Sequence, residues 1–372
     1  MAGFINLFCL KLSTSPLETL TNNMHEEDDD FDVLLLLTAA HSRREACLSS
    51  VRREVHQQMI EGAWRAAMRT RHYLTVSCLD VPCVAAWMAL YKNGFDSNFL
   101  NATSLTRAAF KHLLRRFARY YYIPPARSRG KPPKLRYHHQ ALGLVLCFYV
   151  GSMENGTLCM LFGVPPSTLS RTLCKAEEAL SCALRDFAPA RISWPSPSRQ
   201  RELASLVNAR EPLLQYTFGF IDGKNFRAKH NCPGSWNDSD TSLGFRMKLL
   251  DPMYCPDDRM NVVSDSAFPC STAMTGGILT PLKDGDLERI EPSLRSSART
   301  LHNAITSVRQ AAEWGMGSVQ KVYSRLNLPL PFDPNLRGLR LNNMFRMANY
   351  RVRTIGISEI RTTFTGAMEM AL

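Results

Sequence analysis

The sequence predicts an α/β protein in which a mainly helical N-terminal part is followed by a smaller part that combines strands with helices. Apolar residues recur at helical spacing, with few breakers, through residues 33–90 and 139–184. After residue 215, short apolar runs end in an aspartate, a pattern that predicts strands. The chain has 372 residues and is 45% hydrophobic, which is enough for a sizeable core and about two domains.

The best domain boundary lies near residue 190, in the Pro- and Ser-rich stretch FAPARISWPSPSRQ. We therefore expect a disordered acidic lead-in over residues 1–32 and a helical region over 33–190. Residues 191–335 form the expected catalytic part, and 336–372 a peripheral C-terminal tail. Within the helical region, the pattern over residues 33–90 predicts helices, and the stretch 33–71 is interpreted as two of them.

The charge balance points to a polyanionic partner. Lys and Arg number 45 against 33 Asp and Glu, a formal net charge of +12. Nucleic acid is the first candidate for such an excess, and a soluble basic protein without such a partner is the alternative. The longest apolar runs, at 34–40 and 142–150, are about half the ~20 residues that a membrane span needs. We expect no membrane association.

Residues 97–153 contain no Asp or Glu at all. In this segment FKHLLRRFARYYY predicts a helix with cations on one side, and IPPARSRGKPPK predicts a basic loop. A phosphate-binding surface is favoured over a merely solvated face with a linker. The candidate DNA-binding residues here are Arg115, Arg116, Arg119, Arg127, Arg129, Lys131, Lys134 and Arg136.

The next stretch has the pattern of a helix-turn-helix. Helices are predicted at 139–150, 155–162 and 168–184, with a turn at Gly163-Val164-Pro165 and Ser167 as N-cap of the last helix. The start of that helix would face DNA, and a plain helical hairpin whose serines only cap is the alternative. The candidate contacts are Ser167, Thr168, Ser170 and Arg171.

Four acids in the second part are candidates for metal chemistry. Asp222 follows the predicted strand 216–221, Asp238 closes a turn-rich loop, Asp265 follows a second short strand, and Glu313 lies in a helix predicted over 293–326. Each alone is more often a cap, a turn acid or a surface charge. Together they suit Mg²⁺, a hard cation that prefers oxygen, and phosphodiester cleavage by two such ions.

These stretches carry a family resemblance. FGFIDGKN, HNCPGSWND, VVSDSAFP and the long Arg-x-x-x-Glu helix, in this order, resemble the PIF/Harbinger-type DDE transposases and their domesticated nuclease relatives, the DDE superfamily endonucleases. The upstream helix-turn-helix and Trp194-Pro195 recur there as well, so the resemblance covers about residues 100–330. It implies an RNase H-like catalytic domain with a mixed sheet, Mg²⁺ or Mn²⁺, DNA as substrate and a nuclear location. Whether a separate partner protein supplies DNA binding stays open.

By position, the resemblance implies that Asp222 is the first catalytic aspartate, Asp238 the second and Glu313 the third acid. Asp265 matches a further acid of the family pattern and is a rival third metal ligand.

The chain departs from the family pattern between the first two aspartates, which the family separates by several tens of residues. Only residues 223–237 lie between them here, too few for two more strands with their turns. We interpret this as a missing internal piece, through either a genuine deletion or an exon-skipping gene model, which predicts a truncated sheet with an exposed edge. Two hypotheses follow: a metal-dependent DNA endonuclease or transposase-derived enzyme, and a catalytically inactive remnant that binds DNA through its basic helical region.

Overall fold

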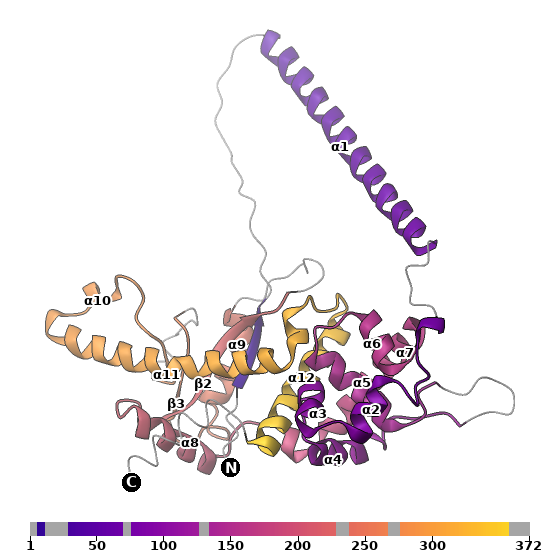
Figure 1. Cartoon of the computed structure of the whole chain (residues 1–372). Coiled ribbons are helices and arrows are strands. Elements are labelled where there is room, and N and C mark those ends of the chain that lie inside the picture. The colour runs from indigo at the N-terminus through magenta and orange to yellow at the C-terminus, as the bar shows by residue number, and fades with distance from the viewer. Residues whose placement is uncertain are drawn as a thin grey trace. The chain divides into compact units, whose positions relative to one another are not determined.

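The computed structural model describes residues 6–11, 29–69, 76–125, 134–227, 238–266 and 276–356. Its contacts divide the chain into two compact units, one made of Met1–Thr14 with Val76–Leu372 and the other of Ser15–Thr75 (Figure 1). The division therefore does not fall near residue 190, where we predicted it.

The smaller unit holds one long helix, α1 (Asp29–Arg69). The two predicted helices are thus a single helix here, followed by the short helix α2 (Ala86–Asn93) in the larger unit. α1 begins inside the acidic run that was predicted to be disordered. Aspartates at the start of a helix are favoured by the positive end of the helix dipole, which accounts for this start.

The first strand of the larger unit comes from the expected lead-in. β1 (Asn6–Lys11) pairs in parallel with β2 (Thr217–Asn225), from Asn6 opposite Phe220 to Lys11 opposite Asn225. The prediction of disorder is therefore wrong for residues 6–11. The physical reason is that β2 offers a row of backbone donors and acceptors on the side away from β3, and β1 pairs with it.

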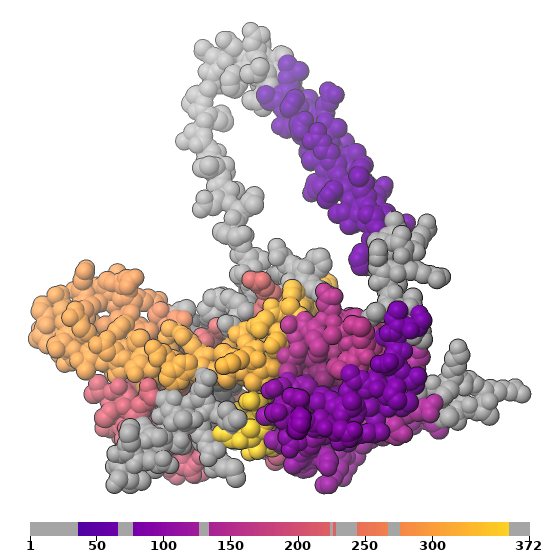
Figure 2. Space-filling model, viewed as in Figure 1, coloured from indigo at the N-terminus to yellow at the C-terminus, as the bar shows by residue number. Residues whose placement is uncertain are grey.

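Helices build the helical part of the larger unit, and the early ones lie against later helices of the same part (Figures 1 and 2). After the 3₁₀ turn η1 (Val76–Cys78) and α2 they are α3 (Asp96–Thr103), α4 (Arg107–Phe117), α5 (His138–Val150), α6 (Asn155–Phe162), α7 (Pro166–Arg185) and the 3₁₀ turn η2 (Ala188–Ala190).

The predicted helix, turn and helix at 155–184 are present, with one difference in capping. Gly163 ends α6 with φ of 66°, a left-handed conformation that glycine adopts without a Cβ penalty. The N-cap of α7 is Pro165, and Pro166 is its first residue, so Ser167 lies inside the first turn and is not the cap. Proline at the first position supplies the fixed φ that a starting helix needs.

Residues 334–355 are not a peripheral tail. They form α12 (Pro334–Ile355), which packs on α7. Met344, Met347 and Tyr350 of α12 are fully buried, and the Tyr350 hydroxyl donates to the Ala109 carbonyl at 2.7 Å. The prediction failed because α12 carries many arginines, and its apolar face is matched by helices more than a hundred residues earlier.

The sheet has the order β1-β2-β3-β4, with β3 (Asn261–Val263) and β4 (Ile278–Leu279). Every described strand pair is parallel, whereas the family resemblance implied a mixed sheet. The other elements of this part are α8 (Pro197–Arg210), α9 (Asp238–Leu250), α10 (Asp286–Arg289), η4 (Pro292–Leu294), α11 (Arg295–Val322) and η5 (Ser324–Asn327).

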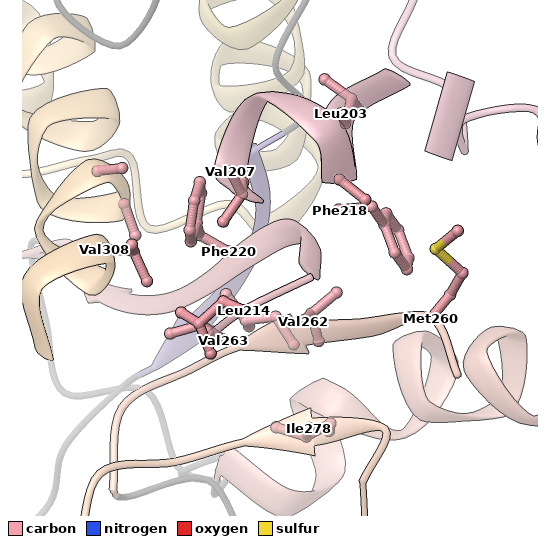
Figure 3. Close-up of a cluster of buried hydrophobic side chains, with 14 of the residues drawn as sticks. Leu203, Val207, Leu214, Phe218, Phe220, Met260, Val262, Val263, Ile278 and Val308 are labelled. Atoms are coloured by element: carbon pink, nitrogen blue, oxygen red, sulfur yellow. The ribbon is translucent and has the colours of Figure 1, made fainter. Parts of the chain in front are cut away.

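The core of this part lies around β2. Phe220 and Ile221 are both buried, and since successive strand residues face opposite sides, both faces of β2 are covered. Leu203 and Val207 from α8 and Val308 from α11 belong to the same cluster (Figure 3). The Trp194 indole N–H donates to the Tyr254 carbonyl at 2.9 Å and its ring packs on this cluster. This packing fixes α11 against the sheet and so positions the acids described next.

Candidate functional site

The strand register places Asp222 and Asp265 at the same level of the sheet. β2 and β3 are parallel, and Phe220 is paired with Val263. Asp222 lies two residues after Phe220, and Asp265 lies two residues after Val263. Because side chains alternate along a strand, the two carboxylates belong to corresponding positions of neighbouring strands. Asp222 is inside β2, beyond the predicted strand end, and β3 ends two residues before Asp265.

The third acid comes from α11. Ala311 and Ala312 of this helix are buried in the cluster around β2, which brings the next residue, Glu313, to the rim of the sheet. The predicted helix over 293–326 is confirmed with bounds at Arg295 and Val322. Three elements that are distant in sequence therefore contribute one carboxylate each.

Arg309 connects two of these acids. Its Nη2 lies 2.9 Å from Glu313 Oε1, one turn along α11, and its Nη1 lies 3.6 Å from Asp265 Oδ2. The Arg309 side chain is 27% exposed, so these charges meet in a partly desolvated place where Coulomb interactions are stronger than in open water.

The electrostatics of Asp222 tie it to the same group. Burial raises the pKa of the Asp222 carboxyl above its usual value, and the negative charges of Asp265 and Glu313 raise this pKa further. The Arg309 guanidinium and the Gly223 backbone N–H oppose the rise. An acid whose pKa is raised by burial and by other carboxylates is typical of a functional site, although structural ion pairs also produce such shifts.

The donor chemistry of this group suits a hard divalent cation, because all three side chains offer carboxylate oxygens. As folded, however, no three His, Cys, Asp or Glu side chains within the described part of the chain are grouped so that they could hold a metal ion. The positive charge beside the acids comes from Arg309.

Asp238, the predicted second aspartate, is the first residue of α9, and the loop that it was predicted to close lies outside the described residues. Its side chain lies outside the described residues.

The predicted DNA-binding residues of the basic segment divide into exposed and structural ones. Arg116 is partly buried, donates from Nε to the Ala183 carbonyl at 2.6 Å, and lies over the Phe187 ring at 5.4 Å. Arg116 therefore clamps α4 to the end of α7, and a phosphate would have to displace it. The exposed candidates are Arg115, Arg119, Lys134 and Arg136. The remaining three, Arg127, Arg129 and Lys131, lie outside the described residues.

The start of α7 forms one wall of a groove of about 400 Å³. Ser167, Ser170 and Arg171 are exposed and Thr168 is half-buried. The groove contains three cations and no acid, and its lining is Tyr121, Tyr122, Ile123, Pro124, Lys134, Leu135, Thr168, Arg171, Thr172 and Lys175.

Sequence reasoning missed three contributors. Arg309 was noted only as part of the Arg-x-x-x-Glu pattern, although its spacing of four from Glu313 signals a helical ion pair. Lys175 lies one turn after Arg171 on the same face of α7, which the helical period could have revealed. Tyr122 is 75% exposed in the groove wall, and no local sequence signal distinguishes it from its two tyrosine neighbours.

Comparison of the chain with protein-family models, with curated proteins and with solved structures finds no match. Among the described residues, no helix combines the length and the apolar character that crossing a membrane requires.

Proposed function

We propose that this protein acts on DNA as a metal-dependent endonuclease or transposase-derived enzyme, with Asp222, Asp265 and Glu313 as the acidic centre. The observation that carries the proposal is the convergence of these three carboxylates from β2, the end of β3 and α11, where Arg309 pairs with both Asp265 and Glu313. Burial raises the pKa of Asp222, and the charges of the other two acids add to that rise. In the two-metal DDE mechanism, one divalent cation, Mg²⁺ or Mn²⁺, would activate the attacking oxygen and a second would stabilise the leaving oxygen of the phosphodiester.

The proposal assigns the second aspartate differently from the family resemblance. Asp265 lies level with Asp222 in the parallel register and is within ion-pair distance of the arginine that also pairs with Glu313. Asp238 starts a helix, a position where an acid is favoured by the helix dipole whatever its other contacts. We therefore give Asp265 the role of cation ligand and Asp238 a structural one.

The proposed roles of the three acids follow from the strands and the helix that hold them. Asp222 lies in β2 and Asp265 lies two residues after the end of the neighbouring strand β3, and Glu313 can approach from α11, which contacts both strands. For a cation to bind Asp265 and Glu313 together, the Arg309 guanidinium has to leave at least one of them.

A nicking assay on supercoiled duplex DNA with Mg²⁺ or Mn²⁺ tests the proposal. We expect the full chain to nick the DNA only with the cation, and Asp222→Asn to abolish nicking. Glu202→Gln, at an exposed residue of α8 that pairs with Arg199 and not with Arg309, serves as the matched acid-to-amide control. Equal nicking by the wild type and Asp222→Asn, or none by either, would contradict the proposal.

A second candidate function is DNA binding without cleavage, and the groove beside α7 favours it. Lys134, Arg171 and Lys175 line that groove, and no acid does. Cations near the start of a helix that faces outward are the arrangement by which helix-turn-helix proteins hold phosphates and reach base edges. On either proposal the location is nuclear, and a partner protein could add sequence preference.

Salt titration of duplex binding tests this second candidate in the full chain. Replacing Lys134, Arg171 and Lys175 with alanine should weaken binding and flatten the dependence of log K on log salt by about 0.9 for each phosphate that the variant no longer neutralises. Arg185→Ala, at the exposed far end of α7, is the matched control and should leave both quantities unchanged. An unchanged salt slope in the triple variant would exclude the groove as the DNA-binding surface.

A further inference from the structure

A positively charged side chain, that of Arg309, lies beside two of the three acids of the proposed centre, Asp265 and Glu313. Arg309 lies within 2.9 Å of Glu313 Oε1 and 3.6 Å of Asp265 Oδ2, so one guanidinium spans a helix residue and a residue at the end of a strand. The Glu313 contact alone would be an ordinary pair four residues apart on a helix surface. The Asp265 contact makes it a bridge between α11 and the sheet.

The charge of Arg309 also acts on the remaining acid, Asp222. Arg309 opposes the rise in the pKa of Asp222, while Asp265 and Glu313 add to it. Three carboxylates that influence one another in a partly buried place repel, and Arg309 is the nearby positive charge that offsets the repulsion. The role resembles that of a bound cation, with the difference that a guanidinium donates hydrogen bonds and cannot coordinate several oxygens at one point.

We propose that Arg309 is a built-in counter-cation, which holds Asp265 and Glu313 together in the metal-free protein and competes with a divalent cation for the same carboxylates. The inference rests on the proposed function, because it concerns regulation of the same site. It explains why three acids converge and yet are not grouped for metal binding in the described part of the chain. The Arg309 side chain is long and partly exposed, so it can withdraw to solvent when a cation enters.

Binding of Mn²⁺, followed by the electron paramagnetic resonance signal of the free ion, tests the competition without any activity measurement. Arg309→Gln removes the competing charge while keeping a polar, though shorter, side chain. We expect this variant to bind Mn²⁺ more tightly, on the order of tenfold, because the ion no longer displaces a charge-assisted pair. Arg299→Gln is the matched control, since Arg299 is exposed on the same helix, and its Mn²⁺ affinity should equal that of the wild type.

A measurement on the wild type keeps the test independent of variant folding. Phenylglyoxal modifies accessible guanidinium groups, and mass spectrometry locates the modified arginine. If Mn²⁺ displaces Arg309, its modification should increase with Mn²⁺ concentration, while that of Arg299 stays constant. A purely structural clamp would show no such dependence.

The outcomes separate the two proposals. Tighter Mn²⁺ binding by Arg309→Gln, or increased modification of Arg309 with Mn²⁺, supports the competition. Equal or weaker Mn²⁺ binding by Arg309→Gln, with wild-type binding intact, overturns the counter-cation role and leaves the proposed cation site standing. Absence of Mn²⁺ binding in the wild type and in both variants overturns both proposals.

Discussion

The acidic centre shows what single residues reveal before a structure is known. Asp222, Asp265 and Glu313 were all identifiable from the sequence, because each ends an apolar run or lies in a patterned helix. The sequence did not indicate which of the other acids lies beside Asp222. That depends on the register of β2 against β3, in which Phe220 pairs with Val263. Register is set by long-range packing, whereas the family resemblance assigned the second aspartate by the order of the motifs, as Asp238, which is the first residue of a helix.

One residue predicts a pH dependence of stability. His139 stacks on Tyr91 with ring centroids 4.1 Å apart, and its Nδ1 lies 3.4 Å from the Trp87 indole nitrogen. Burial, with smaller contributions from Lys92 and His138, lowers the pKa of His139 from 6.5 to about 4. Between these values the unfolded chain binds the proton and the folded chain does not, so stability falls as the pH falls from 6.5 to about 4.

Urea unfolding across that pH window measures the effect. His139→Gln should flatten the pH dependence of the free energy of unfolding, while His112→Gln, at an exposed position, should leave it as in the wild type. The same slope in the wild type and in His139→Gln would refute the assignment.

At the scale of the elements, the bounds of helices were predictable and their partners were not. α6 has the predicted bounds, and α7 begins two residues before the predicted start. These bounds were close because a glycine and two prolines mark the end of one helix and the start of the next. α12 was missed because its partner, α7, is far away in the chain, and no local pattern records that contact.

The turn between α6 and α7 depends on Gly163. A Cβ at this position would meet the Asp80 carbonyl oxygen, and φ is 66°. Gly163→Ala should lower the free energy of unfolding by about 3 kcal/mol, since it combines backbone strain with overpacking. Gly285 has φ of 83° but open space around a Cβ, so Gly285→Ala is the control and should cost about 1 kcal/mol. Equal losses in the two variants, seen by chemical denaturation, would show that the close approach to Asp80 has no effect.

The pairing of α7 with α12 contains a buried ion pair. Arg340 Nε and Nη2 donate to the two carboxylate oxygens of Glu177 at 2.7 and 3.0 Å, and Glu177 is fully buried. Glu177→Ala should cost about 3–5 kcal/mol, because it leaves the Arg340 charge buried without its partner.

An exposed ion pair provides the comparison. Arg289 and Asp286 are 3.7 Å apart and Arg289 is largely exposed, so Arg289→Ala should cost less than about 1 kcal/mol. If Glu177→Ala also lowered the free energy of unfolding by less than about 1 kcal/mol, water would have to reach the α7–α12 interface.

At the scale of the whole molecule, a segment from the beginning of the chain adds a strand to the sheet. The short interval after Asp222 predicted an exposed sheet edge, and β1 pairs along β2 there. Nothing local in residues 6–11 foretells this pairing, because any apolar extended segment satisfies the backbone groups of an edge equally well.

Removal of residues 1–11 tests whether the pairing of β1 with β2 stabilises the sheet. The shortened chain should melt at a lower temperature and aggregate at lower concentration, because the backbone groups of β2 lose their partner. Differential scanning calorimetry and light scattering measure the two effects. An unchanged melting temperature and unchanged solubility would show that β1 contributes nothing to the sheet.

The assignment of the acidic centre is tested most directly by a comparison of two aspartate variants in Mn²⁺-dependent nicking of duplex DNA. Asp265→Asn should lose nicking by at least about 100-fold, as expected for a cation ligand, while Asp238→Asn should retain most of it. Loss of nicking in Asp238→Asn with activity preserved in Asp265→Asn would contradict the assignment, as would a wild type that does not nick at all.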